Sequence, residues 1–63
     1  MLSENLKRLR TEQRYTRKQL GELAGISKNT IQFIEEKRSD NPGIKTVESL
    51  AKVLKVSIDK LIK

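Results

Sequence analysis

The sequence predicts an all-α fold, a compact domain of five short helices spanning residues 1–63. Three observations lead to this prediction. Apolar residues recur at the three- and four-residue spacing of amphipathic helices. Residues that cap helix N-termini stand directly before three of the segments. No segment alternates polar and apolar residues as a half-buried strand would.

The first helix is expected over residues 3–13. Leu2, Leu6 and Leu9 recur at helical spacing and give this segment one apolar face. The charged side chains between them fall off that face, so they are expected to stay in water. The leucines are therefore the side through which this helix packs.

The second and third helices are joined by a short turn. Thr16 caps the second helix and, with Gln19 three residues later, has the spacing of a capping box. This helix ends near residue 24, where Gly25 suits the positive φ of a helix end. Ser27 then caps a third helix that continues to about Glu36. Two short helices linked by a glycine turn have a shape that fits the major groove of duplex DNA.

A polar loop and two further helices complete the chain. The loop over residues 37–43 contains Asp-Asn-Pro-Gly, a strong helix breaker. Apolar residues at helical spacing predict a fourth helix between Ile44 and Leu54. Ser57 caps a short fifth helix. All five segments favour one all-α domain.

Composition limits what such a domain can do. The chain has 63 residues, which allow one domain at most, and it has neither cysteine nor histidine. No disulfide or thiolate metal site is therefore expected, and the commonest general base is missing. There is no phosphate-binding glycine loop, and the carboxylates fall on solvated helical faces. We therefore expect no enzyme and no cofactor.

The charge pattern points to a partner class. The formal net charge of +6 favours a polyanion. No apolar run approaches the roughly 20 residues that cross a bilayer, and the first residues lack a secretion signal. We therefore expect a cytoplasmic protein that does not engage membranes. The cations expected to flank the third helix form a basic footprint, and they are Arg14, Arg17, Lys18, Lys28, Lys37 and Arg38.

The outward face of the third helix carries residue types that contact DNA bases. At about 100° per residue, Ile31 and Ile34 define the buried side of this helix. Asparagine can pair with adenine, lysine can donate to guanine, and phenylalanine can contact a thymine methyl group. The alternative is an ordinary solvated face, with the phenylalanine in a satellite of the core or in a protein interface. The residues expected on the outward face are Lys28, Asn29, Gln32, Phe33 and Glu36.

With these positions in register, the chain resembles the lambda-repressor-like or Cro-type helix-turn-helix regulators. Residues 17–36 are similar to the family's core, and segments 6–10 and 50–57 are similar to the sequences that flank it. The resemblance implies a sequence-specific regulator of transcription that binds double-stranded DNA. It further implies a repressor that acts by operator occupancy, with residues 27–36 in the major groove. The matching apolar and glycine positions are Leu20, Gly25, Ile31 and Ile34.

The resemblance also implies individual contacts. Thr16 and Arg17 stand where the family holds a phosphate. An arginine in place of the family's common glutamine is expected to raise affinity and salt sensitivity more than specificity. Residues 37–41 resemble the segment that grips the sugar-phosphate chain, with Lys37 where glycine is common. The full set of residues expected to contact DNA is Thr16, Arg17, Lys18, Ser27, Lys28, Asn29, Gln32, Phe33, Lys37 and Arg38.

Three other positions are expected to be structural. Gly21 takes the small-residue position of the second helix, which indicates close approach of the two helices. Arg10 and Glu35 each lie at the border of the apolar face of their helix. The family often pairs residues at these positions, so we expect an ion pair that ties the first helix to the third.

The resemblance leaves two kinds of partner open. One is a second copy of the chain, because the family usually binds DNA as a homodimer on half-sites about one helical turn apart. The other is a different protein, as for an antitoxin or a controller subunit, and such proteins often bind DNA as well. The candidates for a dimer contact, in so far as the core leaves them exposed, are Pro42, Ile44, Val56, Ile58 and Ile62.

Overall fold

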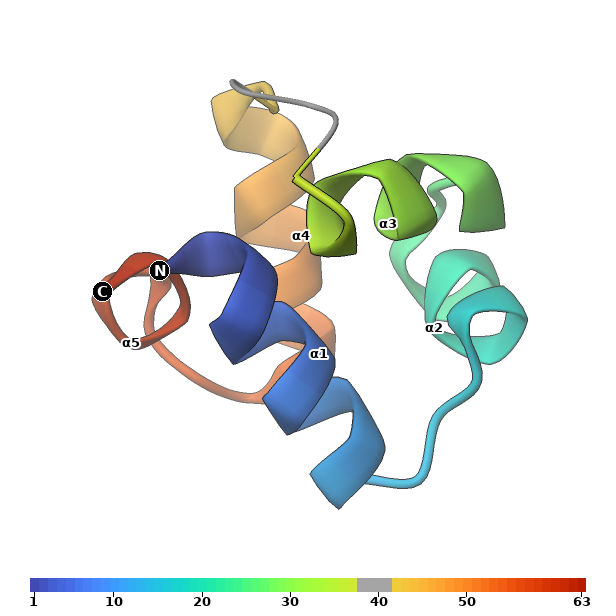
Figure 1. The fold of residues 1–63 in the computed structure, drawn as a ribbon, viewed down its shortest axis with the longest axis horizontal. Helices are drawn as coiled ribbons and strands as arrows, with labels where there is room; N and C mark the ends of the chain where they lie inside the picture. Colours follow the sequence, from blue (N-terminus) through green and yellow to red (C-terminus); the bar gives the residue numbers. More distant parts are fainter. Residues whose placement is uncertain (38–41) are drawn as a thin grey trace.

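The structure, a computed structural model, describes residues 1–37 and 42–63. Within this part of the chain, five helices follow one another and no strand occurs, which confirms the predicted all-α class (Figure 1). The first helix begins and ends one residue earlier than expected, and the third ends at Glu35 instead of Glu36. The helices are α1 (Leu2–Glu12), α2 (Arg17–Ala24), α3 (Lys28–Glu35), α4 (Ile44–Leu54) and α5 (Ile58–Ile62).

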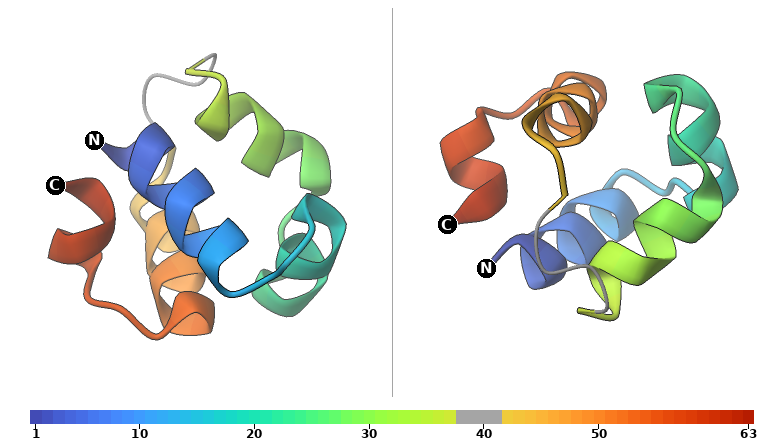
Figure 2. Two further views of the ribbon diagram at one scale, coloured as in Figure 1. Left: turned by 60° about the horizontal axis from the view of Figure 1, so that its bottom comes forward. Right: turned by 90° about the horizontal axis from the view of Figure 1, so that it is seen from above.

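The helices are arranged in three groups. Figures 1 and 2 show α2 and α3 side by side at one end of the molecule and α5 at the other, with α1 and α4 between them. α1 contacts both α3 and α5, and α4 contacts both α2 and α5. The first and third helices are therefore in direct contact, although the helix between them in sequence packs against α4.

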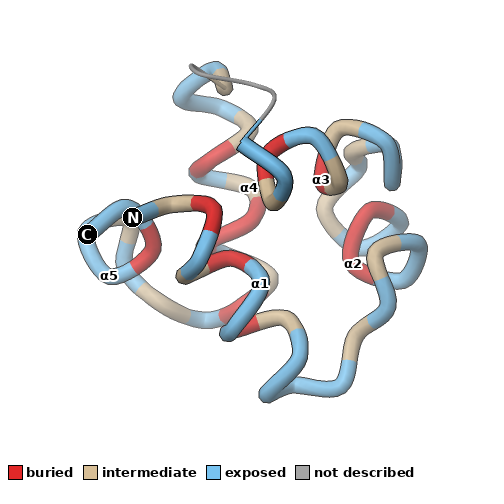
Figure 3. Tube along the Cα trace, in the orientation of Figure 1, coloured by how far each residue is buried: buried red, intermediate tan, exposed pale blue. Residues whose placement is uncertain are grey.

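A single apolar core lies between the helices. Figure 3 shows that buried residues occur on every helix. Every helix contributes to this core, and Leu6, Leu20 and Leu61 are completely buried. Burying a side chain of this size contributes about 1.5–3 kcal/mol relative to leaving it exposed. Of the leucines predicted for the first helix, Leu2 is only partly buried. The full core consists of Leu6, Leu9, Leu20, Ile31, Ile34, Val47, Leu50, Ala51, Leu54 and Leu61.

The predicted helix caps are confirmed. The Thr16 hydroxyl accepts from the Gln19 backbone N–H at 3.0 Å, and the Gln19 side chain accepts from the Thr16 N–H at 2.9 Å. The hydroxyls of Ser27 and Ser57 each accept from a backbone N–H three residues on, both at 3.1 Å. Gly25 has φ 69°, in the left-handed region. A cap of this kind is worth about 1 kcal/mol, so the starts of α2, α3 and α5 are set locally.

Two further caps join distant parts of the chain, and the sequence did not predict them. The Gln13 side-chain amide donates to the Leu54 carbonyl at 2.7 Å, and the Asn5 amide donates to the Leu61 carbonyl at 2.9 Å. Both acceptors belong to the last turn of a helix, where carbonyls lack an intrahelical partner. These bonds attach the C-terminal end of α5 to α1, and that of α4 to the residue that follows α1.

The described helices were also searched for a membrane-spanning candidate. None is both long enough and apolar enough to cross a bilayer.

Candidate nucleic-acid interface

The α2–α3 pair is held at close range by Gly21. A methyl group at this position would overlap the backbone carbonyl oxygen of Ile26, which cannot turn aside as a side chain could. The Gly21 carbonyl in turn accepts from the Ile26 N–H at 2.8 Å. The expected close approach at Gly21 is therefore confirmed. This close approach fixes the orientation of α3 against α2, and therefore which side of α3 faces solvent.

One side of α3 is buried and the other faces solvent, as predicted. Ile31 is 0% exposed and Ile34 is 2% exposed. On the opposite side Lys28 and Asn29 are exposed, and Phe33 is 43% exposed. An outward phenylalanine next to lysine and asparagine gives this surface both an apolar contact and hydrogen-bonding groups.

Gln32 lies among these residues but its side chain is already engaged. It is half-buried, and its amide donates to the Glu36 carboxylate at 3.0 Å. One of its two amide hydrogens is therefore committed within the helix. The amide retains one hydrogen and its carbonyl oxygen for other contacts.

The starts of α2 and α3 bring three of the expected residues to the surface. Thr16, Lys18 and Ser27 are all exposed. The two hydroxyls act as N-caps, and that of Ser27 also lies 2.9 Å from the Thr30 hydroxyl. The first backbone N–H groups of a helix point outward without an intrahelical partner, which makes a helix start favourable for anions.

The expected ion pair between α1 and α3 is present. Arg10 Nε lies 2.7 Å from Glu35 Oε2, and Arg10 Nη2 lies 3.1 Å from Glu35 Oε1. The remaining terminal nitrogen, Nη1, donates to the Tyr15 carbonyl at 2.9 Å. The side chains are 11% and 1% exposed. The pair is bidentate and largely buried, and the bidentate geometry makes arginine–carboxylate contacts strong.

Arg17 is a third member of this network, which the sequence did not predict. Its Nε donates to Glu35 Oε1 at 3.1 Å, and its side chain is 34% exposed. Among the described residues, its two terminal nitrogens have no hydrogen-bond partner. Glu35 therefore accepts from Nε of Arg17, and the two terminal nitrogens of this guanidinium remain able to donate to a ligand. Sequence spacing gave no sign of this contact because it depends on how α2 crosses α3.

The segment after α3 is described only in part. Lys37 has φ 61° and stands in the left-handed conformation that glycine adopts most easily. Its ammonium lies 3.8 Å from the Glu4 carboxylate, and both side chains are largely exposed, so this pair contributes little to stability. Arg38, the last of the residues expected to contact DNA, lies outside the described residues.

The candidates for a dimer contact divide into two groups. Ile44 is 61% exposed and Ile62 is 42% exposed. Val56 and Ile58 pack partly against the core, and Pro42 is half-buried. Among these candidates, the exposed apolar surface is therefore concentrated at the first residue of α4 and the last residue of α5.

The described residues contain no cluster of three histidine, cysteine, aspartate or glutamate side chains that could hold a metal ion. The surface around α3 is built instead from cationic, amide, hydroxyl and aromatic groups. These groups suit recognition of a polyanion by hydrogen bonding and charge.

Comparison with known proteins agrees with this geometry. The chain matches the helix-turn-helix family over residues 6–61. The HTH-type transcriptional regulator SinR of Bacillus subtilis (strain 168) is 34% identical over 62 residues, which cover 98% of this chain and 56% of SinR. The chain thus spans about half the length of the curated relatives that it matches.

Two solved structures are also similar. A crystal structure of SinR, described as the master regulator for biofilm formation, in complex with DNA superposes with a TM-score of 0.94 at 33% identity, covering 100% of both chains. A SinR–SinI protein complex gives a TM-score of 0.94 at 33% identity, covering 100% of this chain and 61% of the other. The family and these relatives are regulators of transcription, not enzymes. On the family match and these likenesses, the chain belongs to the helix-turn-helix family of lambda-repressor-like, DNA-binding transcription regulators.

Proposed function

We propose that residues 1–63 form one DNA-binding domain that recognises a specific duplex sequence and represses transcription by occupying an operator. The observation that carries this proposal is the exposed face of α3. Lys28, Asn29 and Phe33 face solvent there, while Ile31 and Ile34 anchor the opposite side in the core. The similar SinR structure that contains DNA supports the same reading of the fold. A regulator of this kind works on chromosomal DNA, so we place the protein in the cytoplasm.

In this proposal α3 lies in the major groove and its exposed side chains contact base edges. Asn29 pairs with an adenine through its amide, and Lys28 donates to guanine acceptors. Phe33 contacts a thymine methyl group, which would explain an exposed aromatic ring on this face. Gln32 contributes through the groups that its bond to Glu36 leaves free.

Backbone contacts hold the domain in register on the duplex. The start of α2, with Thr16 as its cap and Lys18 beside it, receives a phosphate. Ser27, at the start of α3, belongs instead with the residues that contact bases. Arg17 donates to the phosphate chain through the two nitrogens that Glu35 does not engage. Lys37 contacts the sugar-phosphate backbone next to the end of α3. Arg38 follows it in the sequence and lies outside the described residues, and it completes the set that we propose to contact DNA. These contacts position the protein, and the bases then decide specificity.

We further propose that the protein binds as a homodimer. Ile44 and Ile62 supply exposed apolar surface for a second copy. Half-sites would then lie about 34–36 Å apart, one helical turn of DNA. The enriched sites of the experiment below test this directly, since a dimer selects two related half-sites at fixed spacing.

The proposal is tested by selecting bound duplexes from a random pool with the wild-type chain and two variants. Asn29→Ala should relax preference at one position of the site, because one base contact is lost. Arg17→Ala should weaken binding of all sequences alike and make the salt dependence shallower by about one unit, because one phosphate contact is lost. Lys7→Ala, an exposed cation of α1 outside the footprint, is the matched control and should change neither. Failure to enrich any duplex would refute sequence-specific binding.

The second candidate function is a protein-binding module, such as an antitoxin or controller subunit. It is favoured by one observation, the similarity to a SinR–SinI protein complex. Tight binding to a co-encoded protein, together with no preference among duplexes, would establish this function instead. Binding to a co-encoded protein and to a preferred duplex would show that the chain combines the two functions.

A further inference from the structure

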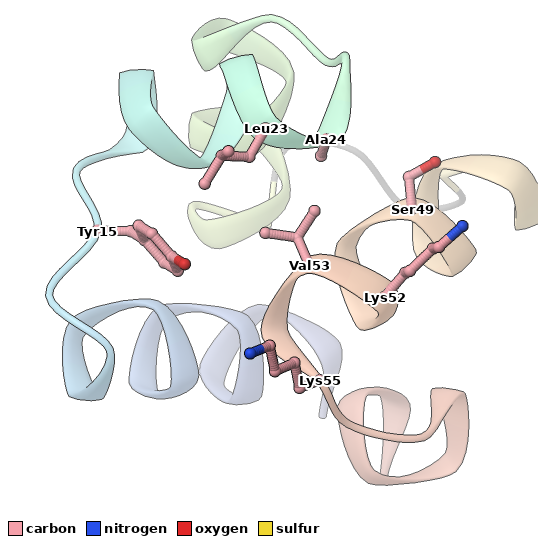
Figure 4. A pocket seen from close by; sticks show the side chains of 7 residues that line it. All are labelled: Tyr15, Leu23, Ala24, Ser49, Lys52, Val53 and Lys55. Atoms are coloured by element: carbon pink, nitrogen blue, oxygen red, sulfur yellow. The ribbon is translucent and has the colours of Figure 1, made fainter.

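An apolar groove lies between α2 and α4, where the DNA proposal makes no use of the surface. It is open to solvent and has a volume of about 440 Å³. Leu23, Tyr15 and Val53 point towards one another across it, with Ala24 beside them (Figure 4). Within the described part of the chain, its lining comes from α2, α4 and the turns that adjoin them, and α3 supplies none. A ligand seated here would leave the exposed face of α3 free.

Leu23 is the central feature of this surface. It is 59% exposed, whereas Leu20 one turn earlier is completely buried. A second hollow of about 420 Å³ adjoins the groove and shares both Tyr15 and Leu23 with it. Leu23 therefore stands between two hollows, on a surface long enough to receive more than one side chain.

The rim of this surface is mainly basic. Lys52 and Lys55 edge the groove, and Arg14 edges the adjoining hollow. Among the described residues that line either hollow, one carboxylate, Glu22, opposes these three cations. An apolar floor between cationic edges is complementary to a segment that has apolar side chains on one face and carboxylates beside them.

We propose that this groove docks an acidic amphipathic helix of another protein. Apolar side chains of that helix, spaced three or four residues apart, pack over Leu23, Tyr15 and Val53. Its carboxylates face Lys52 and Lys55, which sets the orientation and speeds association. A nucleic acid strand would match the cations but would leave the leucine and valine floor without a partner. The inference does not depend on the DNA proposal, because the two surfaces share only Arg14, which edges the adjoining hollow and not the groove itself.

The test is a selection of random 16-residue peptides displayed on phage, with the wild-type chain as bait. The expected winners are acidic and carry apolar residues at helical spacing. Leu23→Lys should weaken the binding of a winning peptide at least tenfold, and the Lys52→Glu, Lys55→Glu double variant should weaken it at least threefold. Lys7→Glu changes an exposed cation of α1 that lines neither hollow, and it is the control that should leave peptide binding unchanged. All four substituted residues are on the surface, and thermal melting checks that each variant folds.

Each contrary outcome has a distinct meaning. A selection that enriches no peptide, or enriches basic or uncharged ones, overturns the proposal. Equal losses for Leu23→Lys and Lys7→Glu would overturn it too, because binding would not then be localised to the groove. If a labelled single-stranded oligonucleotide bound in a Leu23-dependent way while peptides did not, the groove would be a nucleic-acid site. Duplex binding by Leu23→Lys, measured in parallel, shows separately whether the DNA proposal holds.

Discussion

Substituting Arg10 by alanine tests the energetic role of the network between α1 and α3. Arg10 donates to both oxygens of Glu35 and to the Tyr15 carbonyl, so it joins α1 to α3 and to the turn before α2. We expect Arg10→Ala to lower stability before it alters which duplex is bound, because Arg10 acts within the fold and not at the proposed interface.

The expected loss of stability depends on how deeply the ion pair is buried and on the contacts that Glu35 keeps after Arg10 is removed. Removing one partner of a buried ion pair costs about 3–5 kcal/mol. Glu35, 1% exposed, would still accept from Arg17 at 3.1 Å and so would not be left entirely unpaired. We therefore expect a loss of about 3 kcal/mol, at the lower end of that range. For a domain of this size each kcal/mol shifts the melting temperature by about 4–8 °C, so the midpoint should fall by about 12–24 °C.

Thermal and urea unfolding followed by circular dichroism measure this loss. The matched control is Arg8→Ala on the same helix, where the side chain is 51% exposed and lies 3.5 Å from Glu12. An exposed pair four residues apart contributes about 0.3–0.5 kcal/mol, so its midpoint should hardly move. Similar midpoints for the two variants would refute the reasoning. So would a changed duplex preference of Arg10→Ala at a temperature where it is folded.

Three further predictions concern single positions. Gly21→Ala should cost about 1–3 kcal/mol, because the new methyl group overlaps a backbone carbonyl, whereas Gly43→Ala enters open space at φ −59° and should change little in urea titrations. Ser57→Ala should cost about 1 kcal/mol and speed amide exchange in α5, and unchanged exchange would contradict a capping role. Arg17→Lys keeps the positive charge but loses the rigid, planar set of donors of the guanidinium. Fluorescence anisotropy should therefore show several-fold weaker duplex binding, with an unchanged dependence of affinity on salt concentration. A shallower dependence would instead mean that the lysine no longer reaches the phosphate.

The helix starts could be predicted from the sequence because their bonds are local. Thr16, Ser27 and Ser57 each bond to a backbone N–H three residues away, and the structure contains all three caps. The helical period likewise predicted that Ile31 is buried and Phe33 exposed. These features depend on a few neighbouring torsion angles, which the nearby residues themselves restrict.

Features at helix ends were harder to predict. Lys37 and Lys55 adopt left-handed conformations after α3 and at the end of α4, where the usual signal is glycine. A lysine carries no such signal, so local preference gave no indication of these conformations. The helix α1 begins and ends one residue earlier than the approximate bounds expected, and at its start Met1 serves as N-cap without a side-chain bond, so no capping residue marks the boundary.

The sequence by itself determined the fold class, the three caps and the outward face of α3. Only the tertiary structure decided that Arg17 joins Arg10 at Glu35, that Gln13 caps the distant end of α4, and that Leu23 faces a groove. Each of these contacts joins groups on different segments, and its geometry is set by the angles at which whole helices cross. Those angles result from packing the entire core at once, so no window of neighbouring residues contains them.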